Sequence, residues 1–200
     1  MQRVIKIGGS LLLQRGLVPA LQRWDRQQAA GENIYIVGGG EIIDAVRRLD
    51  ARYPADPVEM HWLCVDLLRV TFEMLAGQLP DWSRWKTRDQ FRQLSVDPPN
   101  GGAHLVCVDA FYHRGCEAPL PESWETTTDA IAGWLAVLLG ADELVLLKSC
   151  DADSDRPLRG LADAGIVDTA LPDLADRLGR VRLVNFLALL DGDSGRMGTG

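Results

Sequence analysis

Long hydrophobic runs and blocks of basic residues are both missing from this sequence of 200 residues. The most apolar stretch, at 131–141, is about half as long as the roughly 20 residues that a membrane-spanning helix needs. The first residues read as a strand rather than a signal peptide. Acidic residues outnumber basic ones by 28 to 21, which gives a formal net charge of -7 and disfavours binding to nucleic-acid backbones. We therefore expect a cytoplasmic protein that binds neither membranes nor nucleic acid.

Signatures of several well-known sites are missing too. No two of the four cysteines form a CxxC pair, which favours structural thiols over a disulfide or zinc framework (Cys64, Cys107, Cys116 and Cys150). No spacing of His, Cys and Asp suggests a protein metal site. A GxxxxGK loop followed by Ser or Thr does not occur, and the GxGxxG and GxSxG patterns are absent. Any phosphate site in this chain must therefore have another design.

The residues that are present indicate an α/β protein. Hydrophobic residues make up 46% of the sequence, and short β-rich runs alternate with helical patterns, as is typical of parallel strands joined by helices. We predict a single domain over residues 1–200, built as a three-layer α/β/α sandwich with a mostly parallel central sheet. Strands are expected at 3–7, 33–37, 104–108, 144–147 and 181–184. Helices are expected over 41–53, 58–76 and 128–139, and another is indicated by the spacing of Leu17, Leu21 and Trp24.

Two of these helices are expected to be buried. The helix at 58–76 is apolar on most sides, and the helix at 128–139 is apolar all round, which predicts a central position. Residues 77–102 contain three prolines and mixed signals, so we assign no element there. The segment 149–165 is rich in Asp and Gly, which favours a mobile loop.

Two glycine clusters follow predicted strands. Gly8, Gly9 and Ser10 come after the first strand, and Gly38, Gly39 and Gly40 come after the second. Both clusters lie at carboxyl ends of strands, where open α/β sheets bind their ligands. Glycine lets a backbone approach a ligand closely, and the helix after Gly40 directs free N–H groups forward, so phosphate is the expected guest. The alternative is that both clusters are tight turns that need positive φ.

Lysine is scarce, since the chain has three lysines and 18 arginines among its basic residues. Lys6 lies two residues before Gly8, and Lys148 ends the fourth strand, so both side chains are expected at one edge of the sheet. A compact ammonium group suits a phosphoryl group that moves during a reaction. The alternative is that both are strand-end lysines that reach solvent.

Two further side chains are candidates for a role beside the lysines. Asp129 opens the buried helix at 128–139, where a carboxylate either caps the helix or bridges the two lysines. His61 lies in the apolar helix at 58–76 and is either a buried histidine with satisfied hydrogen bonds or a ligand contact.

Taken together, four motifs resemble the amino acid kinase family. They are VIKIGGSLL from Val4, IVGGGEIID from Ile36, TTDAIAGWLAVLLGADELVLLKSCD from Thr127, and the closing GTG from Gly198. In that family, the first lysine and glycine turn contact the transferring phosphoryl group, the GGG turn holds the acceptor, and an Asp positions the lysines. The resemblance assigns these roles to Lys6, Gly8 and Gly9, to Gly38, Gly39 and Gly40, and to Asp129. It also implies that the segment from Lys148 to 155, with Ser149 and Asp151, lies near ATP.

Shorter stretches are similar to the small family members that phosphorylate (aminomethylfuranyl)methyl phosphate in methanofuran biosynthesis. They are HWLCVDLL from His61, PESWETTTDAIAGWLA from Pro121, LLKSCD from Leu146 and GIVD from Gly165. This resemblance implies a phosphate monoester acceptor, with His61 on the substrate side. One departure is that the GGMxxK segment of many family kinases, which carries a second lysine, reads GIVDTA from Gly165, so Lys148 would supply the missing charge. The usual VDG turn also reads Cys150-Asp151-Ala152.

Our leading hypothesis is an ATP- and Mg²⁺-dependent kinase with Lys6, Asp129 and Lys148 as catalytic residues. Its substrate is a small phosphorylated molecule, and family resemblance implies a homo-oligomer. Ser10, Ser149 and Asp151 join Gly8 and Gly9 on the ATP side. The alternatives are a kinase of the same family that acts on a carboxylate or a nucleoside monophosphate, and a non-catalytic protein that binds a nucleotide or oxyanion.

Overall fold

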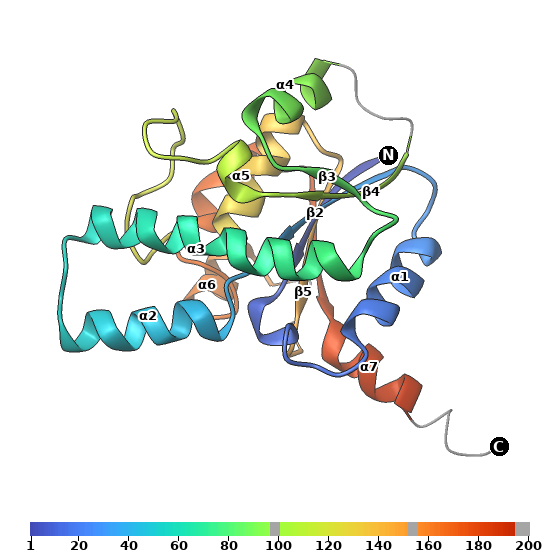
Figure 1. Cartoon of the computed structure of the whole chain (residues 1–200), viewed down its shortest axis with the longest axis horizontal. Helices are drawn as coiled ribbons and strands as arrows, with labels where there is room; N and C mark the ends of the chain where they lie inside the picture. Colours follow the sequence, from blue (N-terminus) through green and yellow to red (C-terminus); the bar gives the residue numbers. More distant parts are fainter. Residues whose placement is uncertain (97–100, 152–155, 195–200) are drawn as a thin grey trace.

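The computed structural model describes residues 1–96, 101–151 and 156–194, and its centre is a six-stranded sheet (Figure 1). The strand order is β3-β4-β2-β1-β5-β6, and each neighbouring pair is parallel. The strands are β1 (Gln2–Ile7), β2 (Glu32–Val37), β3 (Ser83–Trp85), β4 (Gly102–Val106), β5 (Glu143–Lys148) and β6 (Arg180–Asn185). The predicted parallel sheet is therefore confirmed.

Helices cover both faces of this sheet and complete the expected three-layer sandwich. They are α1 (Leu17–Gln27), α2 (Glu41–Arg52), α3 (Pro57–Gln78), α4 (Arg88–Val96), α5 (Thr128–Leu139), α6 (Leu158–Asp163) and α7 (Phe186–Ser194), with short 3₁₀ helices at Gly9–Leu11, Val108–Ala110 and Leu171–Arg177. One core joins α5 and the first half of α3 to the sheet, and a second core joins α1, α7 and the second half of α3 to its other face.

The alternation of side chains along the strands decides which face receives the two lysines. In β1, Val4 packs into the core beneath α5, whereas Ile5 and Ile7 pack into the other core. Because successive side chains point to opposite faces, Lys6 shares the face of Val4. The same alternation in β5 puts Lys148 on the face of Leu146, which also packs beneath α5. Both lysines thus lie on the face that α5 covers.

Several boundaries differ from the sequence prediction. The strand expected at 104–108 is β4 (Gly102–Val106), because pairing with the neighbouring strand ends where the Cys107 N–H donates to the Trp85 carbonyl. A 3₁₀ turn then follows at Val108–Ala110. The stretch at 77–102, left without an element, contains β3 and α4. Within the expected loop at 149–165, residues 158–163 form α6, while 152–155 and the closing GTG at 198–200 lie outside the described residues.

The expectation that α3 is buried on most sides is wrong. Trp62, Val65 and Leu68 are buried, but the opposite face of the helix is open, with Leu63 48%, Val70 44% and Met74 66% exposed. The helix packs on the sheet along one side and faces solvent along the other. Its apolar composition is therefore a poor predictor of how much of it is buried.

The four cysteines are free thiols, which agrees with the prediction that they form no disulfide framework. Burial raises the pKa of Cys64 to about 11 and that of Cys107 to about 12. Within the described ranges, no helix is long and apolar enough to cross a membrane.

Candidate functional site

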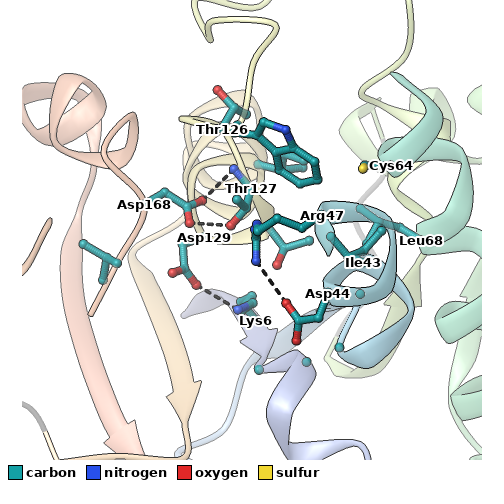
Figure 2. A pocket seen from close by; sticks show the side chains of 18 of the residues that line it. Lys6, Ile43, Asp44, Arg47, Cys64, Leu68, Thr126, Thr127, Asp129 and Asp168 are labelled. Atoms are coloured by element: carbon teal, nitrogen blue, oxygen red, sulfur yellow. Dashed lines mark hydrogen bonds and ion pairs between the residues drawn. The ribbon is translucent and has the colours of Figure 1, made fainter. Parts of the chain in front are cut away.

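A cavity of about 300 Å³ opens at the carboxyl edge of the sheet. Its floor is formed by the ends of β1 and β5 with the two glycine turns, and its walls are formed by α2, α3, the start of α5 and the segment at 165–168. Figure 2 shows Lys6 and Asp129 low in this cavity, with Ile43, Cys64 and Leu68 on the side of α2 and α3. Ligands of open α/β sheets bind at this edge.

Lys6, Lys148 and Asp129 form a buried ionic cluster at the base of the cavity. The Lys6 Nζ lies 3.0 Å from the Asp129 Oδ1, and the Lys148 Nζ donates to the Asp129 Oδ2. The three side chains are 8%, 12% and 4% exposed, so solvent screens their charges weakly. The sequence expectation that these residues converge therefore matches the geometry, and the alternative of two lysines reaching solvent does not.

The cluster carries one more positive than negative charge. Burial alone would raise the pKa of Asp129, but Lys6 and Lys148 outweigh burial and hold that pKa below its ordinary value. Burial and the nearby Lys6 ammonium lower the pKa of Lys148. An anion that enters the cavity meets both ammonium groups and relieves their mutual repulsion, so the cluster is built to receive negative charge.

The two glycine turns pack directly against each other, and this contact explains their glycines. A Cβ atom on Gly9 would lie 2.2 Å from the Gly40 nitrogen, and one on Gly38 would lie 2.7 Å from the Gly9 nitrogen. Gly40 also has a φ of 56°, which other residues rarely adopt. Gly8, Gly9, Gly39 and Gly40 line the cavity. Close packing therefore requires glycine at these turns, while Gly38 does not line the cavity and a ligand-binding role for the turns stays a prediction.

Asp168, which sequence reasoning did not single out, caps α5. It accepts hydrogen bonds from the Thr127 N–H (2.9 Å), the Ala130 N–H (2.8 Å) and the Thr127 hydroxyl. Burial and the Asp129 carboxylate raise the pKa of Asp168, and these donors oppose the rise. The only sequence signal for it was the GIVD resemblance. The GIVD segment thus supplies the carboxylate that fixes the start of α5.

The wall beside α2 carries further residues that the sequence reasoning missed. The Arg47 guanidinium stacks over the Trp124 ring, 4.7 Å from its centroid, and donates to the Asp44 Oδ1 at 3.0 Å. The Trp124 Nε1–H donates to the Asp50 Oδ2 at 2.8 Å. Arg47, Asp44 and Trp124 line the cavity. Asp44 and Trp124 fall within the quoted motifs, but sequence reasoning assigned a role to neither, because their contacts join a helix to an irregular loop far along the chain.

His61 lies in the cavity wall, but both ring nitrogens are engaged. Its Nδ1 lies 3.2 Å from the Ser123 carbonyl oxygen, and its Nε2 lies 2.9 Å from the Tyr112 hydroxyl. The side chain is buried, and burial lowers the pKa of His61. This geometry fits the alternative of a buried histidine with satisfied hydrogen bonds better than a direct substrate contact.

Of the side chains expected on the ATP side, one lines the cavity and two do not. Ser10 lines the cavity, and its hydroxyl lies 2.8 Å from the Ser149 hydroxyl. Ser149 and Asp151 are not among the lining residues, and Asp151 accepts a hydrogen bond from the Asn185 amide at 2.8 Å. Both therefore lie beyond the cavity, on the side where β5 and β6 end.

Comparison with known proteins identifies the fold. No protein-family model and no curated protein sequence matches the chain. Among solved structures, the uridylate kinase from Archaeoglobus fulgidus aligns over 98% of this chain and 96% of its own, with a TM-score of 0.62 and 15% identity. The UMP kinase from Bacillus anthracis aligns over 97% of this chain and 92% of its own, with a TM-score of 0.63 and 16% identity. The UMP kinase from Ureaplasma parvum aligns over 92% of this chain and 89% of its own, with a TM-score of 0.62 and 12% identity. The chain therefore has the fold of these UMP kinases, that of the amino acid kinase family.

Proposed function

We propose that this protein is an ATP-dependent kinase that transfers a phosphoryl group to a small anionic acceptor. The observation that carries the proposal is the buried Lys6–Asp129–Lys148 cluster at the base of the cavity. Likeness in fold to UMP kinases supports it.

Phosphoryl transfer requires the protein to position the reacting groups and to stabilise negative charge, and little else. An acceptor oxygen forms a bond to the γ-phosphorus while the bond to the oxygen bridging the β- and γ-phosphorus breaks, and ADP leaves with that electron pair. Lys6 and Lys148 stabilise the charge on the γ-phosphoryl oxygens, and Asp129 holds both ammonium groups in place. Because Lys148 supplies a second cation, the lysine missing from the GIVD segment is not needed.

The residues fit the phosphates of ATP better than a metal ion held by protein ligands alone. Within the described ranges, no three His, Cys, Asp or Glu side chains are grouped to hold a metal. Asp129 and Asp168 already use both carboxylate oxygens. Mg²⁺ is commonly bound through substrate phosphates and waters, and we propose that it arrives here in that form.

The acceptor is proposed to be anionic because the titratable groups nearest the ionic cluster are already engaged, and Asp44 on α2, which also lines the cavity, pairs with Arg47. Asp129 binds two lysines, Asp168 caps α5, and both nitrogens of His61 are engaged. With a pKa of about 11, the Cys64 thiol is protonated at neutral pH. A phosphate monoester is already ionised near pH 7, so its oxygen attacks without losing a proton to the protein.

The cavity walls support a compact phosphate monoester over a nucleotide. Arg47 offers a guanidinium to the non-reacting oxygens of the acceptor. Part of the wall on the side of α2 and α3 is apolar, formed by Ile43, Val65 and Leu68, whose side chains cannot hydrogen-bond to a base or ribose. The size, about 300 Å³, is at the lower end for small-molecule sites. We propose (aminomethylfuranyl)methyl phosphate as the first acceptor to test, on the sequence resemblance alone, with UMP as the alternative.

The test is ADP release from Mg-ATP over a panel of phosphate monoesters, carboxylates and nucleoside monophosphates. Acceptor-dependent release that falls by about 100-fold or more in Lys6→Ala and Lys148→Met is the expected result. Lys86→Ala is the matched control, because Lys86 binds Glu73 on the surface and lies outside the cavity. ATP binding without ADP release over the whole panel would instead identify a non-catalytic nucleotide-binding protein.

A further inference from the structure

Trp124 joins two walls of the cavity. It lies in the irregular segment at 121–127, which leads into α5, and its indole N–H donates to Asp50 on α2. The face of the same ring carries the Arg47 guanidinium, also on α2. Two different parts of one side chain therefore bind α2, one through a hydrogen bond and one through a cation–π contact.

The other side of this segment is fixed to α3. The Ser123 carbonyl oxygen lies 3.2 Å from the His61 Nδ1 and also accepts from the Thr126 N–H at 3.2 Å. Nearby, the Trp62 indole N–H donates to the Glu122 carboxylate at 2.7 Å. Because α3 holds the segment firmly, the position of Trp124 is set before any ligand enters.

Arg47 needs such a support. Its side chain is 50% exposed, and besides the ring it donates a hydrogen bond to Asp44 one turn earlier on the same helix. A long side chain held so lightly loses rotamer freedom when it binds a ligand, and that loss weakens binding. Figure 2 shows the Arg47 side chain reaching into the cavity, where it bonds to Asp44. Its guanidinium carbon lies 4.7 Å from the centroid of the Trp124 ring. Stacking on the ring restricts the guanidinium to this position.

We propose that Trp124 is a positioning residue, which holds the Arg47 guanidinium over the cavity so that an anionic acceptor binds without first having to order that side chain. The proposal rests on the proposed function for its substrate. It assigns Trp124 and its anchor Asp50 to acceptor affinity, and leaves the transfer of the phosphoryl group to Lys6, Lys148 and Asp129.

The kinetic test separates affinity from transfer. In Trp124→Leu, which loses both contacts, we expect the KM for the acceptor to rise by about tenfold, with kcat and the KM for ATP changed by less than about twofold. Trp124→Phe keeps an aromatic face and loses the Asp50 hydrogen bond, so it should recover part of the affinity. Trp134→Phe is the matched control, because Trp134 also carries an arginine, Arg177 at 5.1 Å, but lies outside the cavity.

A binding measurement keeps this inference separate from the proposed function. Titration calorimetry with benzyl phosphate and with UMP should give binding that weakens about tenfold in both Trp124→Leu and Arg47→Ala. Such binding without ADP release would support the positioning role and overturn the kinase. An unchanged acceptor KM or Kd in Trp124→Leu, a fall in kcat alone, or no binding of either probe to the wild-type protein would overturn the positioning role.

Discussion

The carboxylate of Asp129 binds Lys6 through one oxygen and Lys148 through the other, so one side chain from α5 joins two neighbouring strands of the sheet. In a buried site, the loss of this carboxylate leaves two ammonium groups without a counter-charge. The consequences for stability and for chemistry can be measured apart.

Asp129→Asn is expected to lower the free energy of unfolding by about 3–5 kcal/mol, because it removes one partner from a buried ionic cluster. It should also lower ADP release, because Lys6 and Lys148 lose their common anchor. Urea unfolding measures the first effect and the ADP assay the second. Wild-type stability in the variant would contradict the buried geometry, even if activity were lost.

Acidification is expected to destabilise the protein through His104 at the other end of the sheet. His104 is buried and stacks on Trp85, with Glu32 and Asp25 as its acidic neighbours, and burial lowers its pKa from 6.5. As pH falls through 6.5, His104 becomes protonated in the unfolded chain while it is still neutral in the folded chain. The unfolded state therefore binds more protons in that window, and the free energy of unfolding drops.

Urea unfolding at about pH 7.5 and about pH 5.5 measures this dependence. His104→Phe keeps a ring against Trp85 and removes the titrating group, so its stability should change less between the two pH values. An equal change in variant and wild type would exclude His104 as the source.

Alanine is expected to have opposite effects on stability at two glycines, one packed between the glycine turns and one exposed in α3. Gly9→Ala puts a Cβ 2.2 Å from the Gly40 nitrogen, so it should destabilise the fold by about 1–3 kcal/mol or more and disturb ATP binding. Gly77→Ala in α3 meets nothing within 4 Å and should stabilise the helix by up to about 1 kcal/mol. Melting temperatures that move in the same direction for both variants would contradict this comparison.

The open face of α3 is where we expect two copies of the chain to associate. Leu63, Val70 and Met74 form an exposed apolar stripe at helical spacing along this face. Met74→Glu should shift the chain toward monomer in analytical ultracentrifugation, with Leu49→Glu on the exposed side of α2 as the control. A wild-type protein that is monomeric at about 100 µM would refute self-association through this stripe.

Local sequence patterns were sufficient to predict the parts of the site that belong to regular elements. Lys6 lies one residue before the end of β1 and Lys148 ends β5, both strands being buried along most of their length, and Asp129 lies in the first turn of a helix whose apolar residues mark it as central. Their meeting follows from the register of parallel strands and needs no detailed packing. The glycine turns were located for the same reason.

Contacts between irregular segments could not be predicted in this way. Asp168 reaches back to the start of α5, and Trp124 reaches α2, from segments without periodicity. The short strand β3 has three residues, too few for a pattern. The open face of α3 was missed because the composition of a helix does not distinguish an apolar side that meets the core from one that meets water.

The pairing of β1 with β5 brings together the two ends of a long stretch of chain, with Lys6 opposite Leu146. During synthesis Lys6 emerges early, long before Asp129 and Lys148, and β1 has only β2 as its neighbour until β5 arrives. A ribosome-bound chain that ends before 128 therefore contains both glycine turns and half of the cavity wall, yet no ionic cluster. The three side chains of the cluster are first present together once Lys148 has been made, so no fragment that ends before that residue can form it.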